Sequence, residues 1–121
     1  MKINFYDTSS LLLNINNLFT EDTTFVVSSI TLKELEEIKT SGVKDADIKF
    51  AARRLLRLLD EHSDKYKVHI FTEDMLDPIL SHHLLVNNDM KILATAYHYN
   101  TVIEPNNINF VTNDLSLKTL A

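Results

Sequence analysis

The sequence of 121 residues contains no cysteine, one glycine and two prolines. The lack of cysteine excludes disulfides, thiolate nucleophiles and cysteine-ligated zinc sites. No apolar stretch approaches the length needed to span a bilayer, and the N-terminus lacks the basic and apolar regions of a signal peptide. A cytoplasmic location without membrane attachment is therefore the simplest interpretation.

Glycine is scarce enough to exclude several phosphate-binding motifs. Gly42 is the only glycine, and Val43 and Lys44 follow it. Dinucleotide-binding and Walker loops need several glycines so that backbone amides can approach phosphate, and the Gly-x-Ser-x-Gly nucleophile elbow needs glycine on both sides of the serine. The net charge of −5 argues against a generally basic surface for nucleic acids, although it leaves room for a local basic patch beside a group of acids.

Periodicity along the chain predicts an α/β fold. The length, with 45% hydrophobic and 24% charged residues, is that of a single globular domain covering residues 1–121. Short β-branched and aromatic runs predict strands at Ile3–Tyr6, Thr24–Val27, Val68–Phe71 and Asn109–Thr112. Apolar residues at helical spacing predict helices at Ser9–Phe19, Ile30–Lys39, Asp47–His62 and Asn87–Tyr99. The remaining segments are expected to be a turn or short helix at Thr72–Pro78, an ambiguous segment with helix favoured at Ile79–Val86, a loop at Asn100–Asn107 and a final helical turn at Leu115–Leu120. Alternating strands and helices predict a three-layer α/β/α sandwich around a central, mainly parallel sheet.

Three aspartates occupy comparable positions in this arrangement. Asp7 and Asp114 each follow a predicted strand and precede a helix, and Asp89 opens a helix. In parallel α/β sheets, ligands bind at the carboxyl edge of the strands, where such positions converge. Each aspartate taken alone would also suit a helix N-cap, so only their convergence distinguishes a site.

Glu34 differs from the neighbouring glutamates on the same predicted helix. It lies roughly 70° from the centre of the apolar face, whereas Glu36 and Glu37 lie about 130° away and should face water. Carboxylates crowded together repel one another, and a cation normally relieves that repulsion. Because oxygen ligands without histidine or cysteine favour Mg²⁺ or Mn²⁺ over zinc, Asp7, Glu34, Asp89 and Asp114 are the candidate ligands of such an ion.

Basic residues that could contact phosphates lie on the long predicted helix. Lys49, Arg53 and Arg57 repeat at four-residue spacing opposite its apolar stripe, and Lys118 follows Asp114 more closely in sequence. The alternative is a solvated charged face paired with the acids at the end of the helix, Asp60 and Glu61. The five histidines show no metal-ligand spacing: His82 and His83 point to different faces, and His62, His69 and His98 are expected to be isolated, with structural roles.

Four segments of the chain together resemble the acidic motifs of PIN-domain nucleases. They are, in order, FYDTSSLL, ITLKELEEIK, NNDMKILATAYHY and NFVTNDLSLKTLA. The basic amphipathic helix ADIKFAARRLLRLLDE, after the second motif, is similar to one found in the PIN domain at the N-terminus of PhoH-like proteins. The resemblance covers nearly the whole chain.

This resemblance implies a PIN-like fold and a metal-dependent hydrolase of phosphodiester bonds, usually in RNA, with single-stranded RNA favoured. Asp7, Glu34, Asp89 and Asp114 match the acidic quartet that would hold Mg²⁺ or Mn²⁺ and activate water, and Thr112 matches a position where the family often has Ser or Thr, near the site or the substrate. It also implies a homodimer as an option, with His82–Val86 as the candidate apolar patch. A PhoH-like ATPase segment, absent from this chain, would be a fused or associated partner.

Two departures from the family pattern favour a second interpretation. Ser9 stands where the family commonly has Asn, which removes an amide that could orient Asp7, and the chain ends soon after the fourth motif. A PIN-fold domain with little catalysis could use the same surface to hold RNA or a protein partner. A third interpretation, a phosphatase with Asp7 as nucleophile, fits less well because the haloacid-dehalogenase-type pattern has a second Asp where this chain has Ser9.

Overall fold

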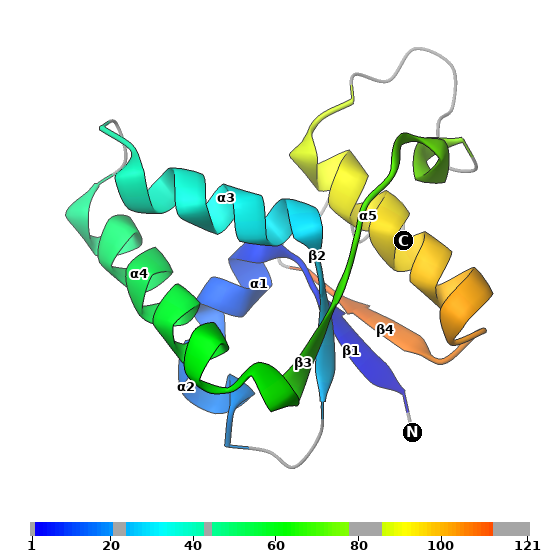
Figure 1. Ribbon diagram of the computed structural model, residues 1–121, viewed down its shortest axis with the longest axis horizontal. Helices are drawn as coiled ribbons and strands as arrows, with labels where there is room; N and C mark the ends of the chain where they lie inside the picture. Colours follow the sequence, from blue (N-terminus) through cyan, green and yellow to red (C-terminus); the bar gives the residue numbers. More distant parts are fainter. Residues whose placement is uncertain (1, 21–23, 43–44, 78–85, 113–121) are drawn as a thin grey trace.

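The computed structural model describes residues 2–20, 24–42, 45–77 and 86–112. These residues form a four-stranded, all-parallel sheet with the strand order β3-β2-β1-β4 (Figure 1). The strands are β1 (Ile3–Tyr6), β2 (Phe25–Ser28), β3 (Tyr66–His69) and β4 (Ile108–Val111). The predicted α/β class, with helices flanking a central parallel sheet, is confirmed.

Helices cover both faces of the sheet because side chains of the central strands alternate between two apolar clusters. On one face, Phe25 and Val27 pack with residues of α1 (Thr8–Leu13), α3 (Ser29–Thr40) and α4 (Ala46–Glu61). On the other face, Phe5 and Val26 pack with α5 (Asn88–His98). All four residues of β2 are buried, as expected for a strand that lies between two helical layers.

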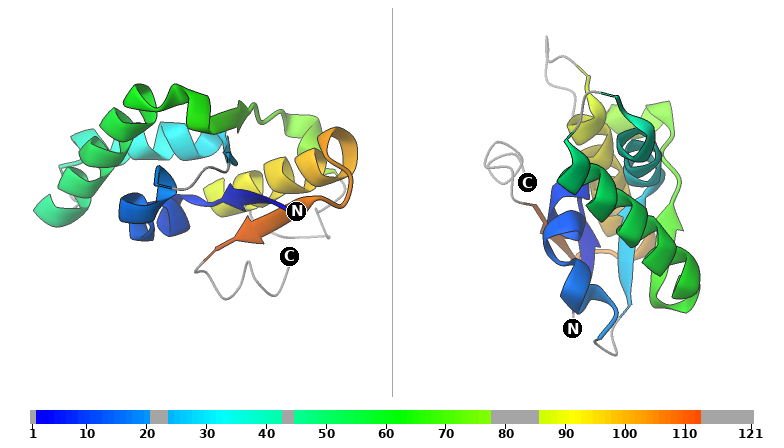
Figure 2. Two further views of the ribbon diagram at one scale, coloured as in Figure 1. Left: turned by 90° about the horizontal axis from the view of Figure 1, so that it is seen from below. Right: turned by 90° about the vertical axis from the view of Figure 1, so that its left-hand side faces the viewer.

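The helices that carry the candidate site begin at clear caps. Ser28 Oγ accepts a hydrogen bond from the Ile30 amide at 3.1 Å, and Asp45 Oδ1 accepts one from the Ile48 amide at 3.0 Å, which satisfies amides that have no partner in the first turn. Helix α4 buries Ala52, Leu55 and Leu59 against the sheet layer, and Figure 2 shows α3 and α4 side by side. Both helices lie within two residues of their predicted bounds.

The predicted helix Ser9–Phe19 is wrong in one respect, because it is broken at Asn14. The segment forms α1 and a separate single turn, α2 (Ile15–Leu18). Asn14 Nδ2 donates to the Ser10 carbonyl oxygen at 2.7 Å, and an asparagine side chain bonded to nearby backbone competes with a continuous helix. The break turns the chain away after α1.

Strand β3 lies two residues before its predicted position at Val68–Phe71. Phe25 pairs with Tyr66 in the sheet register, and their rings stack with centroids 5.8 Å apart. Phe71 lies beyond the strand, and its amide donates to Ser29 Oγ at 2.9 Å. The contact of Tyr66 with Phe25, which is distant in sequence, therefore sets the register of β3. The local hydrophobic pattern alone did not predict that register.

The predicted loop Asn100–Asn107 is wrong for its first residues. Tyr99–Ile103 form a π-helical turn, η3, which continues α5, and the Glu104 amide donates to the Tyr99 carbonyl oxygen at 2.9 Å. A 3₁₀ turn, η1 (Ser63–Lys65), precedes β3, and another, η2 (Glu73–Leu76), occupies part of the predicted turn or short helix Thr72–Pro78. The predictions for Ile79–Leu85 and Leu115–Leu120 lie outside the described residues. None of the helices in the part of the chain that the structure describes could cross a membrane.

Candidate active site at the carboxyl edge of the sheet

Asp7 lies where β1 ends, and its carboxylate is held by donors on both oxygens. It is the N-cap of α1, and Oδ1 accepts from the Ser10 amide at 2.9 Å and lies 2.7 Å from the Ser10 hydroxyl. Oδ2 accepts from the Thr112 hydroxyl. The residue is only 3% exposed. These hydrogen bonds therefore take the place of the hydrogen bonds to water that the carboxylate loses when it is buried.

Thr112 reaches Asp7 because β4 runs parallel beside β1. Tyr6 pairs with Val111 in the register, and the Asp7 amide donates to the Val111 carbonyl oxygen at 3.1 Å. Thr112 is buried, and the Ser10 hydroxyl also lies 2.8 Å from the Val111 carbonyl oxygen. The end of β4 and the start of α1 are thus joined around one carboxylate.

Glu34 occupies the position that its helical angle predicted. It is half-buried, whereas Glu36 and Glu37 are exposed, so the prediction that one glutamate of the three lies at the edge of the core is confirmed. Its Oε1 accepts from the Thr8 hydroxyl at 2.6 Å. Its Oε2 lies 3.5 Å from Asn88 Nδ2, at the outer limit of a hydrogen bond.

Asp89 lies in the first turn of α5 without capping it. The cap is Asn87, whose Oδ1 accepts from the Met90 amide at 2.9 Å. The capping explanation for Asp89 is therefore wrong, while the same explanation holds for Asp7. Asp89 is exposed.

Three of the predicted carboxylates line one shallow pocket. Asp7, Glu34 and Asp89 come from the end of β1, from α3 and from α5, and the pocket wall also contains Thr8, Ser9, Leu12, Ile38 and Ile48. Within the described residues, no three His, Asp or Glu side chains come close enough together to form a metal site. The fourth candidate, Asp114, lies outside those residues. The oxygen-only donors suit Mg²⁺ or Mn²⁺ in kind, although the described donors alone do not enclose an ion.

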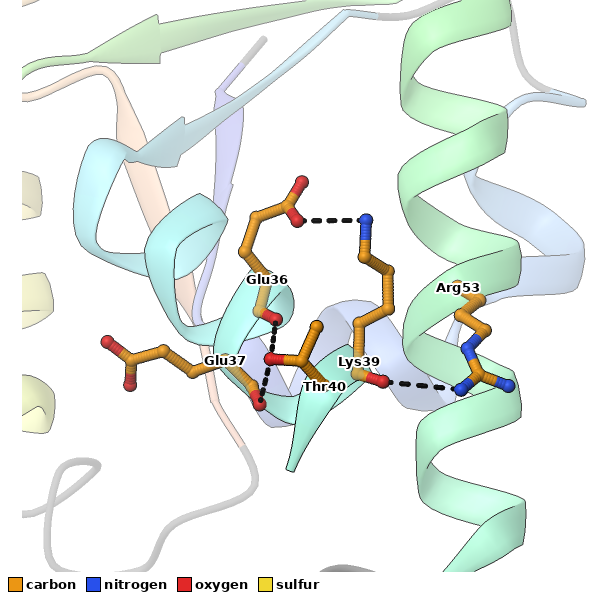
Figure 3. A network of polar contacts seen from close by, with 5 residues as sticks. All are labelled: Glu36, Glu37, Lys39, Thr40 and Arg53. Carbon is orange, nitrogen blue, oxygen red and sulfur yellow. Dashed lines mark hydrogen bonds and ion pairs between the residues drawn. The ribbon is translucent and has the colours of Figure 1, made fainter. Parts of the chain in front are cut away.

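The basic residues predicted to bind substrate are spread along α4. Ile48 lines the pocket; Lys49 follows it on α4 with a side chain about 100° further round the helix, and Arg57 is about 12 Å further along at 1.5 Å per residue. Arg53 Nη2 donates to the Lys39 carbonyl oxygen at 3.4 Å, at the end of α3 (Figure 3). Arg54 donates to Asn16 Oδ1 at 2.9 Å. Lys118 lies outside the described residues.

The alternative role of Lys49, Arg53 and Arg57, in ion pairs with the acids that end α4, is not observed among the described residues. Among the described residues, neither Asp60 nor Glu61 forms an ion pair with them, and the surface ion pair seen nearby joins Lys39 Nζ to Glu36 Oε2 at 3.0 Å. Arg53 instead approaches a helix C-terminus, where carbonyl groups favour a cation.

The prediction that His69 and His98 are isolated is wrong. His69 Nε2 lies 2.9 Å from His98 Nδ1, and the rings stack with centroids 5.1 Å apart. Burial, and in smaller part repulsion from His98, lowers the pKa of His69 below its ordinary value. His62 stacks on Phe19 with centroids 4.9 Å apart, consistent with a structural role. His82 and His83, with most of the predicted His82–Val86 patch, lie outside the described residues.

Two residues at the site were missed by the sequence interpretation. Ser10, which is fully buried, orients Asp7, and its signal was the three-residue spacing from an N-cap to a side chain that can bond back. Thr8 contacts Glu34, and only its place beside Asp7 hinted at this. Ser9, which stands where the family commonly has an asparagine with a side-chain amide, has its hydroxyl oxygen 3.3 Å from Asp7 Oδ1.

Comparison with known proteins gives the family. A profile of the PIN domain matches residues 5–121. A solved structure with a similar fold is VapBC2 from Rickettsia felis bound to a DNA fragment from its promoter, with a TM-score of 0.59 and 17% identity over 98% of this chain and 93% of that chain. No curated protein matches the chain. Because the profile match spans nearly the whole sequence, the chain belongs to the PIN domain family.

Proposed function

We propose that this PIN domain is a Mg²⁺- or Mn²⁺-dependent ribonuclease. PIN domains are generally nucleases. The observation that carries the proposal is the pocket at the carboxyl edge of the sheet, to which β1, α3 and α5 each contribute a carboxylate: Asp7, Glu34 and Asp89. Asp114, which follows β4, would complete the quartet, since β4 neighbours β1.

In the proposed reaction, each residue has a distinct task. Asp7, Asp89 and Asp114 would hold the divalent ion, and Glu34 would complete the set or hold a water. The chemistry supplied by an ion there would be a lower pKa of water and stabilisation of charge on the phosphoryl oxygens. Ser10 and Thr112 orient Asp7. Because each carboxylate oxygen has two lone pairs, Oδ2 retains acceptor capacity beyond the bond from Thr112.

The substrate must bring its phosphates to a protein with a net charge of −5. We propose that Lys49, which follows the pocket residue Ile48 on α4, is the first phosphate contact, and that Arg53, Arg57 and Lys118 extend the path of a single-stranded RNA. Thr112, which is buried against Asp7, acts on the substrate through that carboxylate.

The finer assignments rest on the sequence motifs. We propose that the chain is related most closely to the PIN domain of PhoH-like proteins, because the basic helix after the second motif corresponds to α4. With this relation we propose a cytoplasmic location, a homodimer, and a PhoH-like ATPase segment as a fused or associated partner.

The test is cleavage of end-labelled single-stranded RNA, with single-stranded DNA of the same sequence in parallel. We expect cleavage in Mn²⁺ or Mg²⁺, none in EDTA, and a loss of at least about 100-fold in rate in Asp7→Asn and Asp89→Asn, because each removes a charged ligand. Asp60→Asn, an exposed change at the far end of α4, is the matched control and should retain activity. RNA cleavage that persists in EDTA and in both site variants would overturn the mechanism, and faster cleavage of DNA would overturn the substrate.

A second candidate function, a binding scaffold with little catalysis, is favoured by one observation. Asp7 is 3% exposed and both of its oxygens already accept hydrogen bonds from the protein. Retention of labelled RNA without cleavage in Mn²⁺, unchanged in Asp7→Asn, is the result expected of a scaffold.

A further inference from the structure

Glu34 is the carboxylate at which three helices meet. Its Oε1 accepts a 2.6 Å hydrogen bond from Thr8 at the start of α1, and its Oε2 faces Asn88 Nδ2 at 3.5 Å at the start of α5. Both donors are neutral, and Glu34 forms no ion pair with a described residue, since Lys39 binds the exposed Glu36 instead. The side chain is therefore held in place at the pocket wall, and its negative charge is not paired with a cationic side chain of the described residues.

The hydroxyl of Thr8 also contacts a second hydroxyl. Thr8 Oγ1 lies 3.2 Å from Oγ1 of Thr31, which is fully buried one turn before Glu34 on α3. A hydroxyl has a single hydrogen, and the shorter contact to a charged oxygen is the stronger. The hydrogen of Thr8 thus goes to Glu34, and the Thr31 hydroxyl is the second, more distant oxygen within its reach.

From this arrangement we propose that Thr8 is a positioning residue that holds Glu34 toward a divalent cation in the pocket lined by Asp7, Glu34 and Asp89. The inference rests on the proposed metal-dependent function and adds a residue to it. A glutamate on a helix surface loses rotamer freedom when it binds an ion, and a side chain that is already fixed loses less. Thr8 suits this task because its branched side chain is itself restricted and packs with its hydroxyl 3.2 Å from that of the fully buried Thr31.

The experiment is a Mn²⁺ titration read by thermal unfolding, with each variant compared with its own metal-free melting temperature. Thr8→Val removes the hydroxyl at nearly constant shape, and Thr8→Ser keeps it. Thr101→Val is the matched control, because Thr101 is exposed on η3 and its hydroxyl contacts the backbone carbonyl groups of Tyr97 and His98. We expect the Mn²⁺ concentration at half of the maximal shift to rise about 10- to 100-fold in Thr8→Val and to stay near the wild-type value in Thr8→Ser and Thr101→Val.

A merely structural role for Thr8 would lower the metal-free melting temperature and leave the Mn²⁺ concentration dependence unchanged, and that result overturns the inference. Glu34→Gln supplies a second criterion: Thr8→Val should add nothing to the loss of Mn²⁺ affinity in the Glu34→Gln background, since the two residues act through one bond. If Thr8→Val does not unfold cooperatively, Thr8→Ala takes its place against Thr8→Ser. A wild-type protein without any Mn²⁺ response removes the metal site and this inference together, whereas a wild-type response shared by Thr8→Val removes the inference alone.

Discussion

Asp7 joins two functions in one side chain, because it caps α1 and also lines the candidate pocket. The hydroxyls of Ser10 and Thr112 bring α1 and β4 to the same carboxylate. Hydrogen bonds to a charged acceptor are stronger than neutral ones, so the network contributes to stability as well as to the orientation of Asp7. The amide that Ser9 lacks is not needed for that orientation, since Ser10 supplies both a backbone and a side-chain donor.

Removal of the Ser10 hydroxyl should therefore destabilise the fold more than removal of its neighbour's. Ser10→Ala leaves a buried carboxylate with one donor fewer, and we expect the free energy of unfolding to fall by about 1–3 kcal/mol. Ser9→Ala, at an exposed residue with a 3.3 Å contact, should change it by less than about 0.5 kcal/mol. Urea unfolding at neutral pH measures both, and equal effects would contradict the role assigned to Ser10.

At the scale of single residues, helical geometry predicted Glu34 because burial on a helix follows from angle alone. The hydroxyl contacts of Thr8 and the pairing of His69 with His98 were not predictable in this way. Each joins residues more than 20 positions apart, and it depends on which helix lies beside which strand.

The accuracy of the predicted helices and strands also depended on whether the signal was local. The bounds of β1, α3 and α4 were predicted closely because caps and apolar periodicity are local signals. The break at Asn14, the register of β3 and the π-helical turn after α5 were missed. The break depends on the Asn14 side chain, which bonds to backbone rather than to solvent. The register of β3 depends on the ring of Phe25, which lies on another strand.

The contact between β3 and the end of α5 should make stability depend on pH. His69 and His98 share a short contact in which one nitrogen must accept. The pKa of His69 is lowered by burial and then by His98, so between that lowered pKa and the ordinary value near 6.5 the unfolded chain binds more protons. The contribution of His69 to the free energy of unfolding is therefore fully present above the ordinary pKa. It is lost as the pH falls through that value toward the lowered pKa.

Among the described residues, Asp74 on η2 also interacts with this pair, through His98. Its pKa is lowered, first by the hydrogen bond from Thr72 and in smaller part by the charge of His98, so it remains charged over this range. Urea unfolding at pH 7.5 and pH 5 should show the loss in the wild type and a smaller loss in His69→Gln, with His62→Gln, whose ring stacks on Phe19, as the control. A loss in His69→Gln as large as in the wild type would contradict the assignment.

The described part of the molecule is organised as one sheet with an apolar cluster on each face, and a third, smaller cluster joins η2 to α5. Val26 and Val27 are neighbours on β2 and both are buried, yet they belong to different clusters, Val26 to the one under α5 and Val27 to the one under α3 and α4. The strand is common to both layers. The pocket also draws on both, since Glu34 comes from α3 and Asp89 from α5.

If the two clusters depend on one sheet, damage to either should destabilise both. Val26→Ala and Val27→Ala each delete two buried methyl groups, and we expect each to lower the free energy of unfolding by about 2 kcal/mol. Tyrosine fluorescence, to which Tyr66 on one face and Tyr99 on the other contribute, and far-UV circular dichroism should then give one coincident transition in both variants. Val102→Ala, at a residue that is 59% exposed, is the control and should shift the midpoint little. Transitions that separate in one variant and not in the other would mean that the helical layers on the two faces unfold independently. The pocket, whose residues come from both layers, would then be lost when the less stable layer unfolds.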